Sequence, residues 1–222
     1  PMSDEQIPAN ATGSVSTGQE NEDAYADLQS EFQRAWVDSF ADNTSSSIRS
    51  FANSVPRKLD LQKEDVVLVT HYSVDKLDRL SIIARWWNGP LSVAVYCKRP
   101  MDLEVLARYL RSASNITRQA SIHLLFENDA GAIYPHNMLR NLAIDNSGAD
   151  YVLPLDGDFV PTKNAHDSIL SMIQNDSSIR TALREQKSLC VLPVFSITNS
   201  SELALPQNRS ELVEMYQKGL AG

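Results

Sequence analysis

The sequence Val66-Val67-Leu68-Val69-Thr70-His71 opens the regular part of the chain and decides its fold class. A continuous run of apolar, β-branched residues is typical of a strand that is buried on both faces. Residues 73–87 follow with apolar side chains at helical spacing, and Ser73 is a possible N-cap. Asn88-Gly89-Pro90 then provides residues that end helices. The stretch therefore predicts a buried strand followed by an amphipathic helix.

The same alternation of strand and helix continues to the end of the chain. Further strands are predicted at 91–96, 121–126, 151–155 and 189–195, and further helices at 101–113, 135–146, 164–174 and 209–218. Short turns between alternating elements predict a mainly parallel sheet covered by helices. The predicted fold class is therefore α/β. In such sheets a ligand binds beyond the carboxyl ends of the strands.

The first 64 residues differ from the rest. Residues 1–50 contain nine acidic residues and only two basic ones. We expect residues 1–20, which are small and polar, to be disordered or loosely held. Apolar residues at helical spacing predict a helix over 24–40, and 45–56 is interpreted as a linker or a short helix. The chain is thus divided into an acidic N-terminal segment, 1–64, and a domain, 65–222.

Composition limits the class of protein. A length of 222 residues with 42% hydrophobic content is enough for one substantial core. The net charge of −8 and the pI near 5.0 argue against a nucleic-acid-binding surface, which needs a basic stripe. No run of about 18 apolar residues occurs, so no membrane span is predicted. The unusual start, Pro1-Met2, leads us to expect a piece of a longer protein, in which an upstream membrane anchor is possible.

Cysteines and glycosylation motifs indicate the cellular compartment. Cys97 and Cys190 form neither a disulfide framework nor a metal-binding pair. Each lies beside a hydrophobic run, which favours buried free thiols over a bridge between them. Six Asn-x-Ser/Thr motifs occur, and so many favour a protein of the secretory pathway.

The sequence Tyr151-Val152-Leu153-Pro154-Leu155-Asp156-Gly157-Asp158 ends the fourth strand of the domain in two aspartates one residue apart. In an extended backbone, residues i and i+2 point the same way, so Asp156 and Asp158 can aim two carboxylates at one point. Gly157 lets the backbone turn tightly. Mg²⁺ and Mn²⁺ commonly bridge carboxylates to a diphosphate. The alternative is an ordinary strand-ending turn, but the position beyond a buried parallel strand points to a metal site.

A polar helix precedes this strand. Pro135 suits the first turn of a helix, and Asn137, Arg140 and Asn141 share one face at spacings of three and four residues. Arg140 can neutralise a phosphate or a carboxylate with two parallel hydrogen bonds. A solvated polar face is the alternative interpretation of this helix.

Other motifs narrow the chemistry. The four histidines show no metal-ligand spacing; His71, after the first strand, could reach a ligand, whereas His123 alternates within a strand and is predicted to be structural. No Gly-x-Ser-x-Gly, phosphate-loop lysine or Gly-x-Gly-x-x-Gly motif is present. Their absence weakens hydrolase, NTPase and dinucleotide-binding interpretations.

Several blocks of the chain resemble glycosyltransferase family 49, which includes LARGE-type and β-1,4-glucuronyltransferase enzymes that act on dystroglycan glycans. The blocks occur in the family's order over about residues 65–219: Val67 to His71, Trp87 to Tyr96, Tyr134 to Ala143, Tyr151 to Pro161, Leu192 to Phe195, and Asn208 to Gly219. Together these blocks identify the family far more specifically than the aspartate pair alone does.

The resemblance implies a GT-A fold, which is Rossmann-like, a UDP-sugar donor, a glycan or glycoprotein acceptor and a Mn²⁺ ion, with Mg²⁺ as the alternative. Asp156 and Asp158 match the family's Asp-x-Asp pair, which meets the metal and the diphosphate. Asn137 and Arg140 match polar positions of its Tyr-Pro-x-Asn-x-x-Arg-Asn motif near the donor. The pair Thr70-His71 occupies the strand end where the nucleoside would rest.

The family continues beyond this point into a segment with acceptor contacts and a late metal-binding histidine, so a catalytic base is not assigned here. The resemblance implies the donor-binding portion of an inverting, luminal Golgi enzyme, which as a fragment could be inactive alone. One alternative is a nucleotidyltransferase, but residues 69–75 lack the glycine- and lysine-rich loop that it predicts. The other is a degenerate transferase domain that serves as a scaffold or a glycan-binding module.

Overall fold

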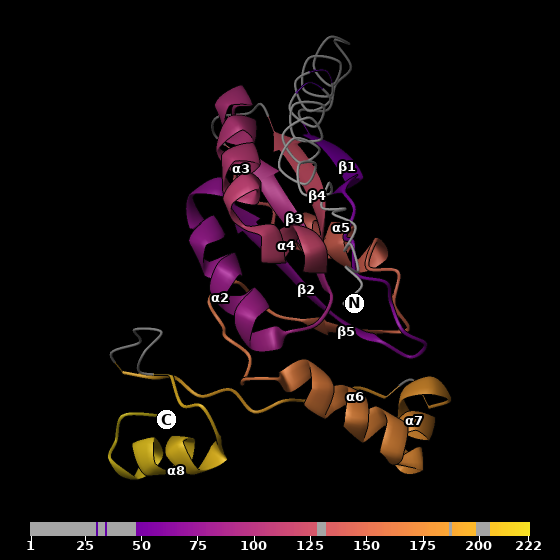
Figure 1. Cartoon of the computed structure of the whole chain (residues 1–222), viewed down its shortest axis with the longest axis vertical. Helices are drawn as coiled ribbons and strands as arrows, with labels where there is room; N and C mark the ends of the chain where they lie inside the picture. Colours follow the sequence, from indigo (N-terminus) through magenta and orange to yellow (C-terminus); the bar gives the residue numbers. More distant parts are fainter. Residues whose placement is uncertain (1–29, 31–33, 35–47, 128–131, 187, 199–204) are drawn as a thin grey trace, which may run out of the picture.

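The structure, a computed structural model, describes residues 30, 34, 48–127, 132–186, 188–198 and 205–222 (Figure 1). The predictions for residues 1–20 and for most of the helix at 24–40 lie outside the described residues. The strands are β1 (Ile48–Val55), β2 (Val66–Ser73), β3 (Leu91–Cys97), β4 (Ala120–Glu127) and β5 (Tyr151–Pro154). The helices are η1 (Val74–Lys76), α2 (Leu77–Trp87), α3 (Pro100–Ser112), α4 (Ser114–Gln119), α5 (His136–Asp145), α6 (Ala165–Asn175), α7 (Ser177–Arg184) and α8 (Arg209–Gln217).

The five strands form one sheet in the order β1-β4-β3-β2-β5. β2 pairs in parallel with β3 and β5, and β3 pairs in parallel with β4. β1 lies antiparallel to β4 at one edge. The prediction of a mainly parallel α/β sheet is therefore confirmed.

Helices cover both faces of this sheet, as predicted. The larger core joins one face to α2, α3, α4 and α6, with Trp87, Leu106 and Ile116 fully buried in it. A smaller core on the other face joins Val67, Val69 and Ala94 to α5. Figure 1 shows α2, α3 and α4 together in front of the sheet and α5 behind it. Alternate residues of β2 point to opposite faces, which is why a continuously apolar strand is needed there.

The interpretation of residues 45–56 as a linker or a short helix is wrong, because Ile48–Val55 is the edge strand β1. The ring of Phe51 packs 5.3 Å from that of Phe126 on β4. The register shifts between Phe51 and Val55, where Asn53 has a φ of 49°. This irregularity hides the strand in the sequence, since it breaks the two-residue alternation that identifies strands.

The strand predicted at 189–195 is also wrong. Leu189 is 92% and Val191 90% exposed, and in the described part of this region the only pairing is an antiparallel bridge between Ile197 and Ala221. The apolar run has strand-like composition, but a strand also needs a neighbour for its backbone hydrogen bonds. Helix α7 is an addition to the predicted elements; Asp176 caps it by accepting hydrogen bonds from the amides of Ser178 and Ile179.

The prediction for the two cysteines has a mixed outcome. Both cysteines are free thiols; Cys97 is buried as expected, whereas Cys190 is exposed. Burial raises the pKa of the Cys97 thiol, which keeps it protonated and unreactive. Within the described ranges, no helix combines the length and the apolar character needed to cross a membrane.

Candidate functional site

The site lies where the strand order of the sheet reverses, at β2. From β2 the chain proceeds through α2 to β3 on one side, whereas α5 leads from β4 to β5 on the other side. The parallel pairing of β2 with β3 reaches Ser73, but its pairing with β5 stops at Val69, opposite Pro154. Among the residues that the structure describes, the last ones of β2 therefore have no strand beside them on the β5 side. A crevice at such a switch point is the usual ligand site of an open α/β sheet.

The structure separates Thr70 from His71. Both lie inside β2, which ends at Ser73 and is longer than predicted. Being consecutive in a strand, their side chains point to opposite faces. His71 contacts Tyr134, just before α5, and His136, the first residue of α5. Thr70 therefore points to the α2 side.

The imidazole of His71 is held between a tyrosine and a carboxylate. Its Nδ1 lies 3.0 Å from the hydroxyl oxygen of Tyr134, and its Nε2 lies 3.8 Å from Oδ1 of Asp156. That Nε2 is buried and makes no hydrogen bond with any described group. Burial lowers the pKa of His71; Asp156 raises it, and His136 and Arg140 lower it further. His71 is therefore neutral near pH 7, with one ring nitrogen directed at Asp156.

Helix α5 brings Arg140 to the same carboxylate. Nη2 of Arg140 donates to Oδ1 of Asp156 over 2.7 Å, and Nη1 lies 3.5 Å from Oδ1 of Asn137. The predicted shared face of Asn137 and Arg140 is confirmed. Arg140 is about one-third exposed and Asp156 about half exposed, so both remain accessible to a ligand.

The two aspartates do not lie in an extended backbone, contrary to the interpretation of the sequence. They lie in a turn, in which the amide of Phe159 donates to the carbonyl of Asp156 over 3.0 Å. Arg140 on α5 holds Asp156, whereas Arg79 on α2 holds Asp158 in an ion pair. The two carboxylates are therefore held by helices on opposite faces of the sheet.

Gly157 is required at the centre of this turn. A Cβ atom there would lie 2.4 Å from the ring of Tyr72, which is 2% exposed. The expected tight turn is thus confirmed, and the reason for glycine is close packing rather than a left-handed φ. Tyr72 therefore supports the aspartate turn by direct contact.

A cavity of about 390 Å³ lies beside this cluster. Its lining residues are Arg140, Pro154, Leu155, Asp156, Phe159 and Val194. The volume is within the range of small-molecule sites. A positive and a negative side chain together with apolar walls suit a ligand that has a charged group and a ring.

The donor atoms present suit a hard divalent cation that shares its ligands with an anion. No cluster of three or more His, Cys, Asp or Glu side chains able to hold a metal occurs within the described residues. Asp156 and Asp158 offer carboxylate oxygens, 51% and 72% exposed as side chains. Mg²⁺ and Mn²⁺ are commonly bound by one or two carboxylates plus phosphate oxygens and water. Asp156 and Asp158 are therefore the side chains that would hold such an ion, and an anion or water would have to supply the remaining ligands.

Sequence reasoning missed Arg79 and the role of Tyr134. Arg79 stands in the first turn of α2, where the helix dipole disfavours a cation. The sequence shows this unfavourable position, but it does not show that the partner is Asp158, 79 residues away. Tyr134 orients His71 through its hydroxyl, and only the fold shows this contact.

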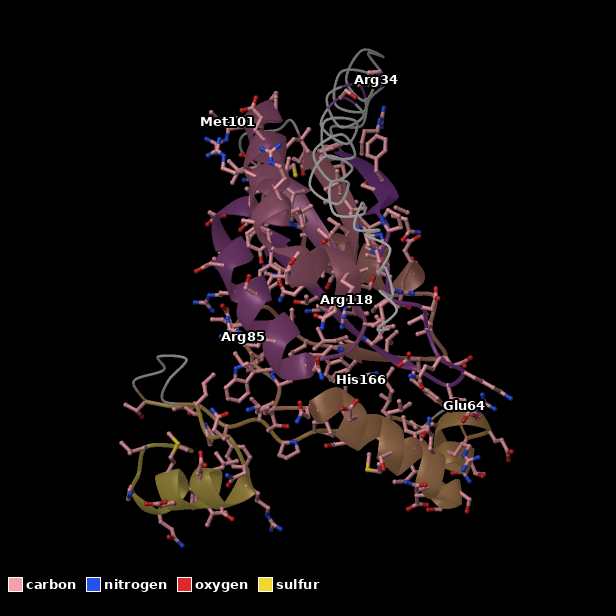
Figure 2. The ribbon with its side chains drawn as sticks, viewed as in Figure 1. Arg34, Glu64, Arg85, Met101, Arg118 and His166 are labelled. Atoms are coloured by element: carbon pink, nitrogen blue, oxygen red, sulfur yellow. The ribbon has the colours of Figure 1, made fainter. Side chains whose placement is uncertain are left out.

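The remaining histidines have structural roles. His123 is fully buried; its Nδ1 accepts from the amide of Asn53 over 2.8 Å and its Nε2 lies 2.9 Å from Oγ of Ser92, which confirms the structural prediction. His166, labelled in Figure 2, lies in the first turn of α6 and is buried, with its Nε2 2.8 Å from Oδ1 of Asp65.

Comparison with known proteins gives consistent matches. Residues 65–133 and 127–222 match the protein family described as "Glycosyl-transferase for dystroglycan". The glycosyltransferase-like protein gnt14 of Dictyostelium discoideum is 32% identical over 174 residues, which cover 72% of this chain and 26% of that protein. The xylosyl- and glucuronyltransferase LARGE2s of Gallus gallus is 31% identical over 157 residues, 70% of this chain and 20% of that protein.

LARGE1 of Homo sapiens, also named a xylosyl- and glucuronyltransferase, is 28% identical over 157 residues, 70% of this chain and 20% of that protein. The chain thus spans about a fifth to a quarter of the length of these relatives.

Proposed function

The chain belongs to glycosyltransferase family 49, and we propose that it forms the donor-binding part of a metal-dependent enzyme that transfers a sugar from a UDP-sugar to a glycan. The observation that carries this proposal is the meeting of Arg140, Asp156 and His71 at the switch point of the sheet, beside a cavity. Such a crevice is where nucleotides bind in open α/β sheets.

Each side chain has a role that follows from its surroundings. Arg140 is placed to donate hydrogen bonds to a phosphate oxygen, and Asn137 steadies its guanidinium. The neutral imidazole of His71 has its unpaired Nε2 toward Asp156, where it orients the carboxylate or contacts the nucleoside. Asp156 and Asp158 would hold Mn²⁺ or Mg²⁺, and the bound ion would offset charge on the departing diphosphate.

The proposed reaction is attack of an acceptor hydroxyl on the anomeric carbon of the donor, with inversion. UDP-glucuronate, UDP-xylose and UDP-N-acetylglucosamine are the candidate donors; the names of the LARGE relatives favour the first two. A glycan of the secretory pathway, within the Golgi lumen, is the proposed acceptor setting. The catalytic base is not among the residues assigned here.

Calorimetry with UDP and Mn²⁺ tests this proposal. We expect UDP binding that requires the metal, and Asp158→Asn should abolish it. Because Asp158 is an exposed turn residue, the same substitution should change the free energy of unfolding by less than about 1 kcal/mol. Arg111→Gln, an exposed change on α3, is a control for charge and handling.

Three outcomes would contradict the proposal. Absence of metal-dependent UDP binding would favour the scaffold interpretation. A large loss of stability in Asp158→Asn would instead show that the aspartate pair is a structural turn. Equal binding of free nucleoside triphosphates and UDP would point to a nucleotidyltransferase.

A further inference from the structure

Arg79 forms an ion pair with Asp158, one of the two carboxylates that would bind the proposed cation. Its Nη1 forms an ion pair with Oδ1 of Asp158, and both side chains are substantially exposed, at 48% and 72%. The ion pair joins the first turn of α2 to the turn after β5. It does not consolidate a buried interface, so packing does not explain it.

The position of Arg79 is unfavourable for its own helix. A helix N-terminus carries partial positive charge, and a cation in the first turn is disfavoured. Asp78, beside it, is the residue type expected there. Asp158 is the counter-ion that the structure gives Arg79, and a cation that binds the same carboxylate oxygen would compete with the arginine.

Arg79 and Arg140 reach the two aspartates from opposite faces of the sheet. Arg140 approaches Asp156 from α5, on the side of the cavity that Asp156 also lines. Arg79 approaches Asp158 from α2, across the opposite face of the sheet. An ion that takes Oδ1 of Asp158 must displace Nη1 of Arg79 from it.

We propose that Arg79 is a positioning residue that neutralises Asp158 until a divalent cation and a diphosphate arrive together. This inference rests on the proposed function. The cation displaces Arg79 from Asp158, and the released guanidinium becomes available to the phosphate oxygens. A diphosphate that binds the released guanidinium favours the state in which Asp158 is open to the cation, and by reciprocity the cation then raises the affinity for the nucleotide.

The test is a calorimetric titration of the chain with Mn²⁺, performed once without UDP and once in the presence of UDP. Arg79→Gln should bind Mn²⁺ alone about two- to fivefold more tightly than the wild type, the factor that corresponds to an exposed ion pair. The gain in Mn²⁺ affinity on adding UDP should shrink by a similar factor. Arg79→Lys, which keeps the charge but loses the planar fork, should lie between the two.

Two controls separate the contact from overall charge. Arg111→Gln removes the same charge from an exposed position on α3 and should leave Mn²⁺ affinity unchanged. In an Asp158→Asn background, where metal-dependent binding is already expected to be lost, Arg79→Gln should not restore Mn²⁺ binding, because the carboxylate that it frees is absent. Thermal unfolding of each variant checks that it is folded.

Each outcome bears on one of the two proposals. If the wild type binds Mn²⁺ and UDP but Arg79→Gln gains no affinity for Mn²⁺, the role of Arg79 is refuted and the transferase proposal stands. An equal gain in Arg111→Gln would also refute it. If no variant binds Mn²⁺, with or without UDP, both proposals fail.

Discussion

Gly157 shows how one missing side chain shapes the site. The turn between the two aspartates lies against the buried ring of Tyr72, and the nearest ring carbon would be 2.4 Å from a Cβ atom at position 157. Tyr72 is packed in the larger core and is only 2% exposed. The glycine therefore couples the aspartate turn to the core of the domain.

We predict that Gly157→Ala destabilises the fold by about 1 to 3 kcal/mol, the usual cost of inserting a methyl group into a packed region. The measurement is the free energy of unfolding in denaturant. Gly222→Ala is the matched control, since a Cβ atom at that position would meet no other atom within 4 Å. Equal stabilities of the two variants would contradict the packing argument.

His123 links the edge strand to the sheet through a fixed tautomer. The amide of Asn53 donates to Nδ1, so Nε2 carries the proton and donates to Oγ of Ser92. Oγ of Ser92 donates in turn to the carbonyl of Ala143 over 2.7 Å. Protonation of Nδ1 would break this chain, and burial lowers the pKa of His123 to about 4.

Acidification should therefore weaken the fold. Since the pKa of an unfolded histidine is about 6.5, the unfolded state gains a proton before the folded state does. Stability is fully present above about pH 6.5 and is lost as the pH falls toward the folded pKa of about 4. We expect a loss of about 2 kcal/mol between about pH 7.5 and about pH 5.

Unfolding in denaturant at several pH values measures this effect. His71, whose pKa is also lowered by burial, contributes with the same sign. His123→Gln keeps a donor toward Ser92 but cannot titrate, so its stability should depend less on pH over this interval. An unchanged pH dependence would show that His123 is not the responsible group.

At the scale of elements, β1 contains one residue, Asn53, with a left-handed backbone conformation. Asn53 has a φ of 49°, in the left-handed region, at the point where the register against β4 shifts. Asparagine tolerates this conformation better than most residues, and a β-branched residue does not. The same property lets Asn88, with a φ of 56°, end α2.

We predict that Asn53→Val destabilises the fold by about 1 to 2 kcal/mol because of backbone strain. Asn53→Gly should stay within about 0.5 kcal/mol of the wild type, since glycine adopts positive φ without strain. Thermal or denaturant unfolding distinguishes the two. Similar losses in both variants would mean that the asparagine side chain, rather than the backbone conformation, is what matters.

For the whole molecule, the sheet extends beyond the region that matches the family. β1 pairs with β4, and Arg57 donates through Nη2 to the carbonyl of Ser147 over 2.8 Å. Both contacts tie residues 48–57 to the domain that begins near Asp65. The segment therefore belongs structurally with the domain.

A chain of residues 65–222 should be less stable than one of residues 48–222 by about 2 to 4 kcal/mol, from the lost burial of Val55 and part of Phe51. It should also aggregate more readily, because the edge of β4 becomes exposed. Thermal unfolding and size-exclusion chromatography measure the two effects. Equal stability of the two chains would show that β1 contributes little.

Much of this protein follows from its residue pattern. Continuous apolar runs at β2, β3 and β4 report burial on both faces, and their alternation with amphipathic helices dictates a parallel sheet. The position of Asp156 just beyond a strand, and the shared face of Asn137 and Arg140, follow from the same local periodicities. The burial expected of that strand is wrong, because β5 is an edge strand in which half-buried and exposed residues alternate.

Other features depend on contacts between residues far apart in the chain, which no local pattern records. Pairing with β4 makes residues 48–55 a strand despite their irregular sequence. Residues 189–195 do not form a strand, because they have no pairing partner among the described residues. The turn at Gly157 sends Asp156 and Asp158 to arginines on opposite faces. Local periodicity thus specifies which residues reach the carboxyl edge of the sheet, while long-range packing specifies which charges meet there.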